Sequence, residues 1–210
     1  MSHRDAVFIV GGILAGGLGT RLGHVEKAGL RVGGVSLLTR CVRLLQRQCD
    51  AVTLIAPLPS AEFPDTICDP GLGPGEAIAT ALSEMPRQYS GATHLLTVSV
   101  DSYLLPADFT ETMLDALTRG AADVAIGQFE DNEYPVNALW RLEAVAPAAR
   151  DGAARSRGRS VRSLYDDLKS TRVNFARADG LDPFTNVNTM HDLVTAQRHF
   201  RRHPDSPQKS

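Results

Sequence analysis

Short apolar runs rich in β-branched residues alternate along the chain with segments whose apolar residues recur at helical spacing. The first run, residues 7–14 (VFIVGGIL), ends in small residues and predicts a buried strand that leads into a loop. Residues 36–48 then predict a helix that Ser36 can cap, and residues 51–56 repeat the strand pattern. Such alternation predicts an α/β fold, with a mostly parallel sheet covered by helices on both faces in a Rossmann-like three-layer sandwich.

The same alternation continues to about residue 200, and Thr189 can cap the last predicted helix. An arginine-rich stretch at 150–162 predicts a surface loop. We expect residues 1–202 to form a single domain, followed by a polar, disordered tail at 203–210. Further strands are predicted at 93–100, 123–127, 135–140 (with Pro135 at the edge of the strand) and 172–175, and further helices at 76–85, 107–117, 161–168 and 190–200.

Composition narrows the class of protein. The 210 residues include 22 basic and 24 acidic side chains, so the chain lacks the basic excess of proteins that bind nucleic acids or membrane surfaces. No apolar run approaches the ~18 residues that span a bilayer, and we expect a cytoplasmic protein. Three cysteines without CxxC spacing, Cys41, Cys49 and Cys68, indicate reduced thiols rather than disulfides or a zinc site.

Candidate chemistry lies where the predicted strands end. Nine of the 18 glycines fall between Gly11 and Gly34, and backbone N–H groups in such a loop can approach an anion closely. Arg21 can hold phosphate oxygens with its planar guanidinium, and Lys27, the only lysine among the first 168 residues, adds a compact charge. The spacing is neither that of a P-loop nor that of the dinucleotide fingerprint, and a glycine-rich turn with solvated cations remains an alternative.

Two aspartates and an asparagine extend this candidate site. Because the carboxyl ends of parallel strands share one edge of a sheet, the glycine-rich loop, Asp69 and Asp101 are expected to converge there. A carboxylate such as Asp101 can hold Mg²⁺ opposite a triphosphate, although an aspartate also favours turns. Asn188, just before the last helix, offers a neutral oxygen to a metal or ligand, or serves in helix capping.

Together, these motifs resemble the MobA-type nucleotidyltransferases. The resemblance rests on LAGG at 14–17 followed by Arg21, Gly23 and Lys27, on an aspartate that ends the third strand, and on Asn-Val-Asn-Thr at 186–189. It extends over most of the chain and implies a nucleotide-diphospho-sugar transferase-like fold. It also implies Mg²⁺-dependent transfer of GMP from GTP to a molybdopterin-type phosphate acceptor, with release of pyrophosphate.

The resemblance implies a role for each matching residue. Arg21, Lys27 and Asp101 would be catalytic, and Asp101 would also bind Mg²⁺. Asn186 and Asn188 would complete the rim near the metal and the acceptor. The residues that would bind the nucleotide are Leu14, Ala15, Gly16, Gly17, Gly19, Lys27, Asp69 and Asp101.

Three departures from the family pattern keep alternatives open. Ile55 stands where the guanylyltransferases have an asparagine, residues 73–77 read Gly-Pro-Gly-Glu-Ala instead of Gly-Pro-Leu-x-Gly, and Ser102 and Tyr103 follow Asp101. Since hydrogen bonds to the base edge decide between guanine and cytosine, a cytidylyltransferase or a sugar-phosphate nucleotidyltransferase remains possible. A non-catalytic nucleotide- or pterin-binding accessory protein is the alternative from another class, and the sequence leaves the oligomeric state open.

Overall fold

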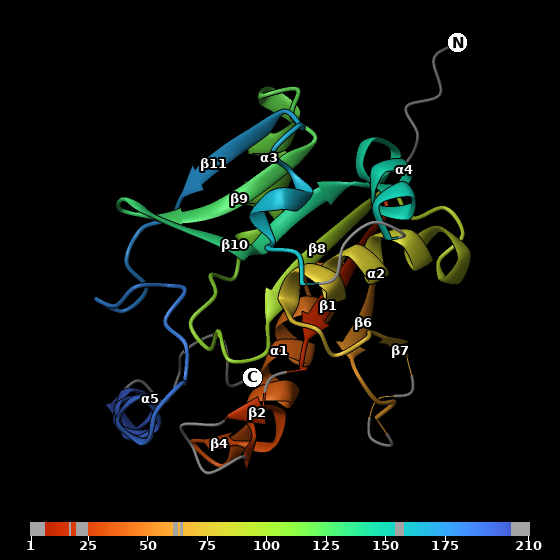
Figure 1. Cartoon of the computed structure of the whole chain (residues 1–210). Coiled ribbons are helices and arrows are strands. Elements are labelled where there is room, and N and C mark those ends of the chain that lie inside the picture. The colour runs from red at the N-terminus through yellow and green to blue at the C-terminus, as the bar shows by residue number, and fades with distance from the viewer. Residues whose placement is uncertain are drawn as a thin grey trace.

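The computed structural model describes residues 7–16, 18–19, 25–60, 63, 65–153 and 158–202. Within these ranges, one seven-stranded sheet has the order β11-β9-β10-β8-β1-β6-β7 (Figure 1). Strand β10 is antiparallel to β8 and β9, and the other neighbours are parallel, so the predicted mostly parallel sheet is confirmed. The strands are β1 (Ile9–Leu14), β6 (Ala51–Ala56), β7 (Thr66–Cys68), β8 (His94–Ser99), β9 (Val124–Phe129), β10 (Asn132–Arg141) and β11 (Ser170–Asn174).

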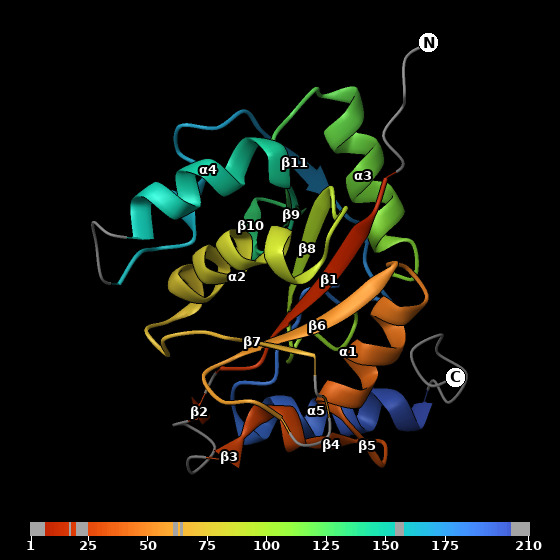
Figure 2. The same ribbon diagram turned by 90° about the vertical axis from the view of Figure 1, so that its right-hand side faces the viewer.

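Helices cover both faces of the sheet, which confirms the predicted three layers (Figure 2). Helices α1 (Leu37–Gln46) and α3 (Phe109–Arg119) pack on one face, and α2 (Pro74–Gln88) and α4 (Leu142–Ala153) pack on the other. Each face has its own apolar cluster, because successive residues of a strand point to opposite sides. In β1, for example, Ile13 joins the cluster beneath α1 and α3.

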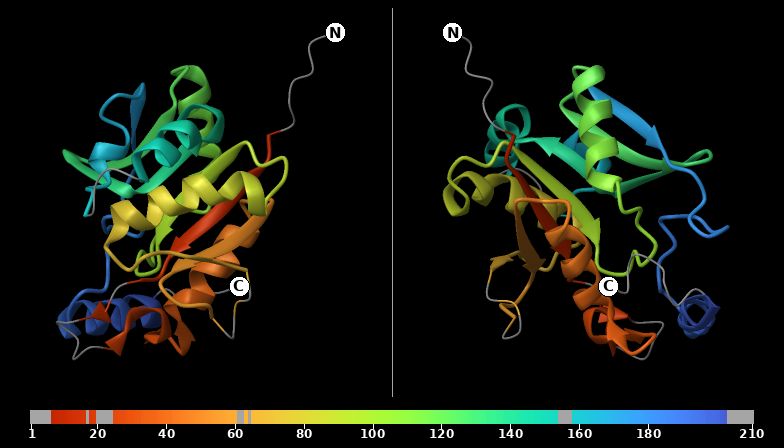
Figure 3. Two further views of the ribbon diagram at one scale, coloured as in Figure 1. Left: turned by 45° about the vertical axis from the view of Figure 1, so that its right-hand side comes forward. Right: turned by 180° about the vertical axis from the view of Figure 1, so that it is seen from behind.

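A third apolar cluster lies beyond the carboxyl ends of β1 and β8, where α5 (Met190–Arg202) packs beside a small hairpin (Figure 3). Phe200 of α5 is fully buried there, and the Arg40 guanidinium lies 3.9 Å from its ring centroid. Arg40 also donates a hydrogen bond to the Val32 carbonyl. These contacts attach the C-terminal helix to the sheet domain. The short strands at this end are β2 (Leu18–Gly19), β3 (Val25–Glu26), β4 (Arg31–Val32) and β5 (Val35–Ser36).

Both predicted helix caps form. Ser36 is the N-cap of α1, and its hydroxyl accepts a 3.1 Å hydrogen bond from the Thr39 amide. At the start of α5, the Thr189 hydroxyl accepts a hydrogen bond from the Asp192 amide, and the Asp192 carboxylate accepts one from the Thr189 amide. This reciprocal pair is a capping box, which fixes the direction in which the chain enters α5.

The predicted helix at 161–168 is wrong. Only a 3₁₀ turn, Arg162–Leu164, forms there, and the amides of Leu164 and Tyr165 bond carbonyls three residues back. The Ser160 hydroxyl accepts a hydrogen bond from the Ser163 amide, so local side-chain bonds compete with an α-helical ladder.

The predicted surface loop at 150–162 is also wrong in part, because α4 extends to Ala153 and the Arg159 side chain is only 9% exposed. Pro135 lies within β10 instead of at its edge, since the strand begins at Asn132. It is accommodated where the register with β9 shifts, between Tyr134 and Ala138. The tail at 203–210 lies outside the described residues.

The three cysteines differ in exposure. Cys41 is buried, Cys49 is partly buried, Cys68 is exposed, and all three are free thiols. Among the described residues, no helix is both long enough and apolar enough to cross a membrane.

His94 gives the fold a pH dependence. It is the first residue of β8, is buried, and lines a cavity of about 800 Å³. Burial and, to a smaller extent, the charge of Arg141 lower the pKa of His94 from its ordinary 6.5 to about 4. The unfolded chain therefore binds a proton at a higher pH than the folded chain. The resulting contribution to stability is complete above pH 6.5 and is lost as the pH falls toward 4.

We therefore expect the free energy of unfolding to decrease as the pH falls from about 7 to about 4.5, and to decrease less in the His94→Gln variant. Glutamine has no titratable group, so the variant loses only the proton-linked part of the change. Urea unfolding of both proteins across this pH range measures the difference. A variant with the full pH dependence of the wild type would show that another group is responsible.

Candidate active site

The carboxyl ends of four parallel strands, β1, β6, β7 and β8, meet at a cavity of about 280 Å³. The start of α2, the middle of β10 and the segment before α5 complete its wall. Residues that the sequence placed at separate strand ends thus share one cavity, as the topology of a parallel sheet predicts. Seven predicted site residues line it: Leu14, Gly16, Lys27, Asp69, Asp101, Asn186 and Asn188.

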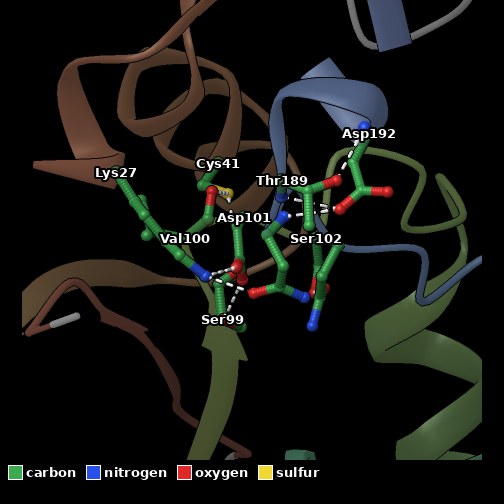
Figure 4. A network of polar contacts seen from close by, with 10 residues as sticks. Lys27, Cys41, Ser99, Val100, Asp101, Ser102, Thr189 and Asp192 are labelled. Carbon is green, nitrogen blue, oxygen red and sulfur yellow. Dashed lines mark hydrogen bonds and ion pairs between the residues drawn. The ribbon is translucent and has the colours of Figure 1, made fainter. Parts of the chain in front are cut away.

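Lys27 and Asp101 form the central contact of this cavity, and their side chains point toward each other beyond the end of β8 (Figure 4). The Lys27 Nζ atom lies 2.6 Å from Asp101 Oδ2 and 2.5 Å from Asn188 Oδ1. The side chains of Lys27 and Asp101 are only 16% and 4% exposed. The ammonium group is therefore held between the carboxylate oxygen of the buried Asp101 and the amide oxygen of the exposed Asn188.

The same two oxygens suit a divalent cation. Carboxylate and amide oxygens are hard ligands of the kind that Mg²⁺ prefers, and Mg²⁺ often uses one or two carboxylates together with substrate phosphates. Here Asp101 Oδ2 and Asn188 Oδ1 already converge on one cation, the Lys27 ammonium. The donor set therefore fits the predicted metal.

Ser99 holds the other oxygen of this carboxylate, and sequence reasoning missed it. Its hydroxyl donates a hydrogen bond to Asp101 Oδ1, and its amide donates one of 3.2 Å to Oδ1 of the buried Asn137 in β10. Ser99 thus orients Asp101 so that Oδ2 faces Lys27. A serine two residues before an aspartate has no distinctive pattern, so the sequence carries no signal for this role.

The segment before α5 is fixed at two points. The Ser102 hydroxyl donates a 2.8 Å hydrogen bond to Asn186 Oδ1, and Asp192 Oδ2 accepts one of 3.0 Å from the Asn188 amide. Partial burial raises the pKa of Asp192, but hydrogen bonds from the Asn188 amide and from Thr189 outweigh it, so the pKa lies below its ordinary value. Asp192 was also missed, although its position three residues after Thr189 is a capping-box signal.

Burial keeps the thiol of Cys41, which lies near Asp101, protonated. Cys41 donates a hydrogen bond to the Val100 carbonyl at 3.4 Å, and burial together with the charge of Asp101 raises its pKa to about 12. The thiol is therefore protonated at neutral pH and contributes packing rather than nucleophilic chemistry.

Asp69 lines the same cavity as Asp101 and directly follows β7, a strand that the sequence did not predict. Its Oδ1 atom accepts a 2.6 Å hydrogen bond from the Gly71 amide. Its Oδ2 atom is buried and has no hydrogen-bond partner within the part of the chain that the structure describes. A buried acceptor without a donor is costly, so this oxygen is suited to a donor group of a ligand.

The predicted loop residues are placed only in part. Gly17 and Arg21 lie outside the described residues, as does Gly23, and Gly19 belongs to the short strand β2. The Ala15 amide donates a hydrogen bond to the Ile55 carbonyl, which joins the ends of β1 and β6. Gly16 faces Pro57 and Asp69, and a Cβ atom there would lie 3.0 Å from Pro57 Cδ.

The departure from the family pattern at Gly75 has a steric reason. A Cβ atom on Gly75 would lie 2.1 Å from the Arg159 carbonyl oxygen, so any other residue would displace the segment that packs on the start of α2. Glu76 Oε1 accepts a hydrogen bond from the Arg159 amide and lies 3.8 Å from Arg159 Nε. Gly75 and Glu76 thus replace the usual sequence with a contact to the segment after α4.

We expect Gly75→Ala to lower the free energy of unfolding by about 1–3 kcal/mol, the usual cost of overpacking. In an open helical position the same change stabilises a protein, so a loss is diagnostic. Gly29→Ala is the matched control, because a Cβ atom on Gly29 meets nothing within 4 Å. Urea unfolding compares the two, and a Gly75→Ala variant as stable as the wild type would refute the steric account.

Ile55 and Tyr103, which also depart from the family pattern, make contacts that explain their presence. Ile55 is fully buried and forms part of the apolar cavity wall with Leu14 and Val136. Tyr103 is buried against α5, with ring centroids 5.9 Å from Phe200 and 6.5 Å from His199. The loop after Asp101 is therefore joined to the C-terminal helix.

Comparison with known proteins identifies the family. A family model described as the MobA-like NTP transferase domain matches residues 11–171. The molybdenum cofactor guanylyltransferase of Rhizobium meliloti is 35% identical over 198 residues, which cover 88% of this chain and 88% of that protein. The protein of the same name from Rhizobium rhizogenes is 34% identical over 198 residues and 89% of each chain.

Solved structures share the fold. Molybdopterin-guanine dinucleotide biosynthesis protein A from Archaeoglobus fulgidus has a TM-score of 0.71 and 16% identity over 92% of this chain and 99% of that one. The 4-diphosphocytidyl-2C-methyl-D-erythritol synthase from Anaerococcus prevotii has a TM-score of 0.69 and 14% identity over 94% of this chain and 100% of that one. Both have the nucleotide-diphospho-sugar transferase fold, as predicted. From the family model and the sequence identity of its relatives, the chain belongs to the MobA-like NTP transferases.

Proposed function

We propose that this nucleotidyltransferase transfers GMP from GTP to a molybdopterin-type phosphate acceptor, uses Mg²⁺ and works in the cytoplasm. The observation that carries the proposal is the cavity in which Lys27, Asp101 and Asn188 meet at the carboxyl ends of the strands. The names of relatives at about one-third identity support the choice of GTP and molybdopterin.

The nucleotide lies along the strand ends in this proposal. The backbone of Leu14, Ala15 and Gly16 contacts it, and the apolar surface of Leu14, Ile55 and Val136 accepts the base. Asp69 Oδ2, the buried acceptor without a partner among the described residues, receives a donor from the base or the ribose. Gly17, Gly19 and Arg21 surround the phosphates.

The reaction joins two anions, so charge neutralisation is the main task of the protein. A terminal phosphate oxygen of the acceptor forms a bond to the α-phosphorus of GTP while the bond from that phosphorus to the bridging oxygen breaks, and pyrophosphate leaves. Lys27 and Arg21 stabilise the charge on the departing pyrophosphate. Asn186 and Asn188 position the acceptor near the α-phosphorus.

Asp101 and Asn188 would hold Mg²⁺, with Ser99 keeping the carboxylate in position. When bound, the ion neutralises charge on the phosphate oxygens. Asp192 fixes the backbone of Asn188, the second of these residues.

Binding isotherms for GTP, CTP, UTP, TTP and ATP, each with and without Mg²⁺, test the proposal. The proposal requires that GTP binds most tightly and that Mg²⁺ strengthens its binding. If CTP binds most tightly, the protein would still be a nucleotidyltransferase, but with another substrate. This outcome is possible because Ile55 offers no amide group to the edge of the base. Absence of binding by every nucleotide would favour the accessory-protein alternative.

A further inference from the structure

The Lys27 ammonium occupies the place between Asp101 and Asn188 that a cation ligand would need. Its nitrogen lies 2.6 Å from Asp101 Oδ2 and 2.5 Å from Asn188 Oδ1. The Ser99 hydroxyl takes the other carboxylate oxygen. Each oxygen of Asp101 therefore already has a donor in the absence of any ligand.

A metal ion alone competes poorly with this arrangement. Within the described residues, no group of three or more His, Cys, Asp or Glu side chains could hold a metal ion, so Asp101 would be supported mainly by neutral oxygens. A divalent cation on Asp101 Oδ2 would also lie beside the Lys27 ammonium, where poor solvation strengthens the repulsion between like charges.

A triphosphate changes this balance. Lys27 lines the cavity, and its long, flexible side chain can exchange one anionic partner for another. The Asp101 carboxylate does not depend on Lys27 alone for its position, because Ser99 holds its other oxygen (Figure 4). Asp192 holds the backbone of Asn188 at the start of α5.

We propose that Lys27 is the internal counter-ion of the empty site, and that it leaves Asp101 for the phosphates when a nucleoside triphosphate enters. The metal ion and the nucleotide then bind as a pair, and each increases the affinity for the other. This inference rests on the proposed function for the identity of the incoming anion. In the empty site, the Lys27 ammonium prevents Asp101 and Asn188 from holding a divalent cation.

The test measures Mn²⁺ binding to the whole protein without nucleotide, by electron paramagnetic resonance of the free ion. Lys27→Gln keeps hydrogen-bond donors and removes the charge, so we expect it to bind Mn²⁺ roughly tenfold or more tightly than the wild type. Lys169→Met is the control, because Lys169 is an exposed lysine outside the cavity, and we expect wild-type affinity. The double variant with Lys27→Gln and Asp101→Asn should lose the increase in Mn²⁺ affinity. That loss would show that the tighter binding takes place at the Asp101 carboxylate.

Equal Mn²⁺ affinity of Lys27→Gln and the wild type would overturn the proposal. If circular dichroism shows that Lys27→Gln does not fold, Lys27→Met replaces it. A second measurement needs only the wild type. A slowly hydrolysed GTP analogue should then raise the Mn²⁺ affinity of the wild type at least about tenfold, and an unchanged affinity despite measurable binding of the analogue would overturn the proposal. Failure of every nucleotide to bind would instead refute the proposed function, while the metal-only comparison still decides the role of Lys27.

Discussion

Replacing Asp101 with asparagine is expected to lower the rate of Mg²⁺-dependent nucleotidyl transfer by about 100- to 1000-fold, the usual cost of losing one electrostatic stabiliser in an active site. Asparagine has nearly the same shape, and its amide oxygen can still accept the hydrogen bond from Lys27. Its NH₂ group can donate to the Ser99 hydroxyl oxygen, so the fold should remain intact. The change removes the negative charge that binds a cation in the proposed mechanism and replaces one carboxylate oxygen by an NH₂ group.

Steady-state pyrophosphate release measures this effect, and a thermal melt followed by circular dichroism establishes that the variant is folded. Asp166→Asn makes the same chemical change at an exposed position after the 3₁₀ turn and should leave the rate unaltered. A folded Asp101→Asn variant with near-normal turnover would remove Asp101 from the catalytic machinery.

Replacing Phe200 with alanine should produce the largest loss of stability, about 3–5 kcal/mol, because it opens a cavity under α5. The ring is fully buried and lies against Tyr103 and the Arg40 guanidinium. Since α5 begins just after Asn186 and Asn188, a loosened helix should also reduce activity.

Equilibrium urea unfolding measures the stability change, with Val194→Ala as the control in the same helix because Val194 is partly exposed. Phe200→Leu should recover part of the loss by refilling the cavity. If Phe200→Ala costs no more than Val194→Ala, then the third apolar cluster does not hold α5 in place.

The sheet is well predicted from sequence where strands are buried on both faces. β1, β6 and β8 are nearly continuous apolar runs, which is the pattern of central parallel strands. By contrast, β7 has only three residues, and α4 contains Pro147, so neither has a strong local signal. The turn at Arg162–Leu164 was mistaken for a helix because apolar spacing does not show local serine bonds.

The candidate site, like the fold, could be predicted from sequence only in part. The glycine-rich loop and Asp101 could be brought together from sequence, because both follow predicted strands and the ends of parallel strands share an edge. Asp69 was expected at the same edge, although the strand that leads to it, β7, was not predicted. Ser99 could not, because its role depends on a side-chain rotamer beside Asp101. Val136 reaches the cavity only because β10 is inserted between β8 and β9, and no local pattern shows that insertion.

The most direct test of the proposed function is a transfer reaction with the purified protein, Mg²⁺, molybdopterin and GTP labelled at the α-phosphate. The proposal predicts that label enters the pterin product in equal amount to the pyrophosphate released, and that CTP is a poor substitute. Transfer from CTP but not GTP, or binding of GTP without any transfer of label, would contradict it.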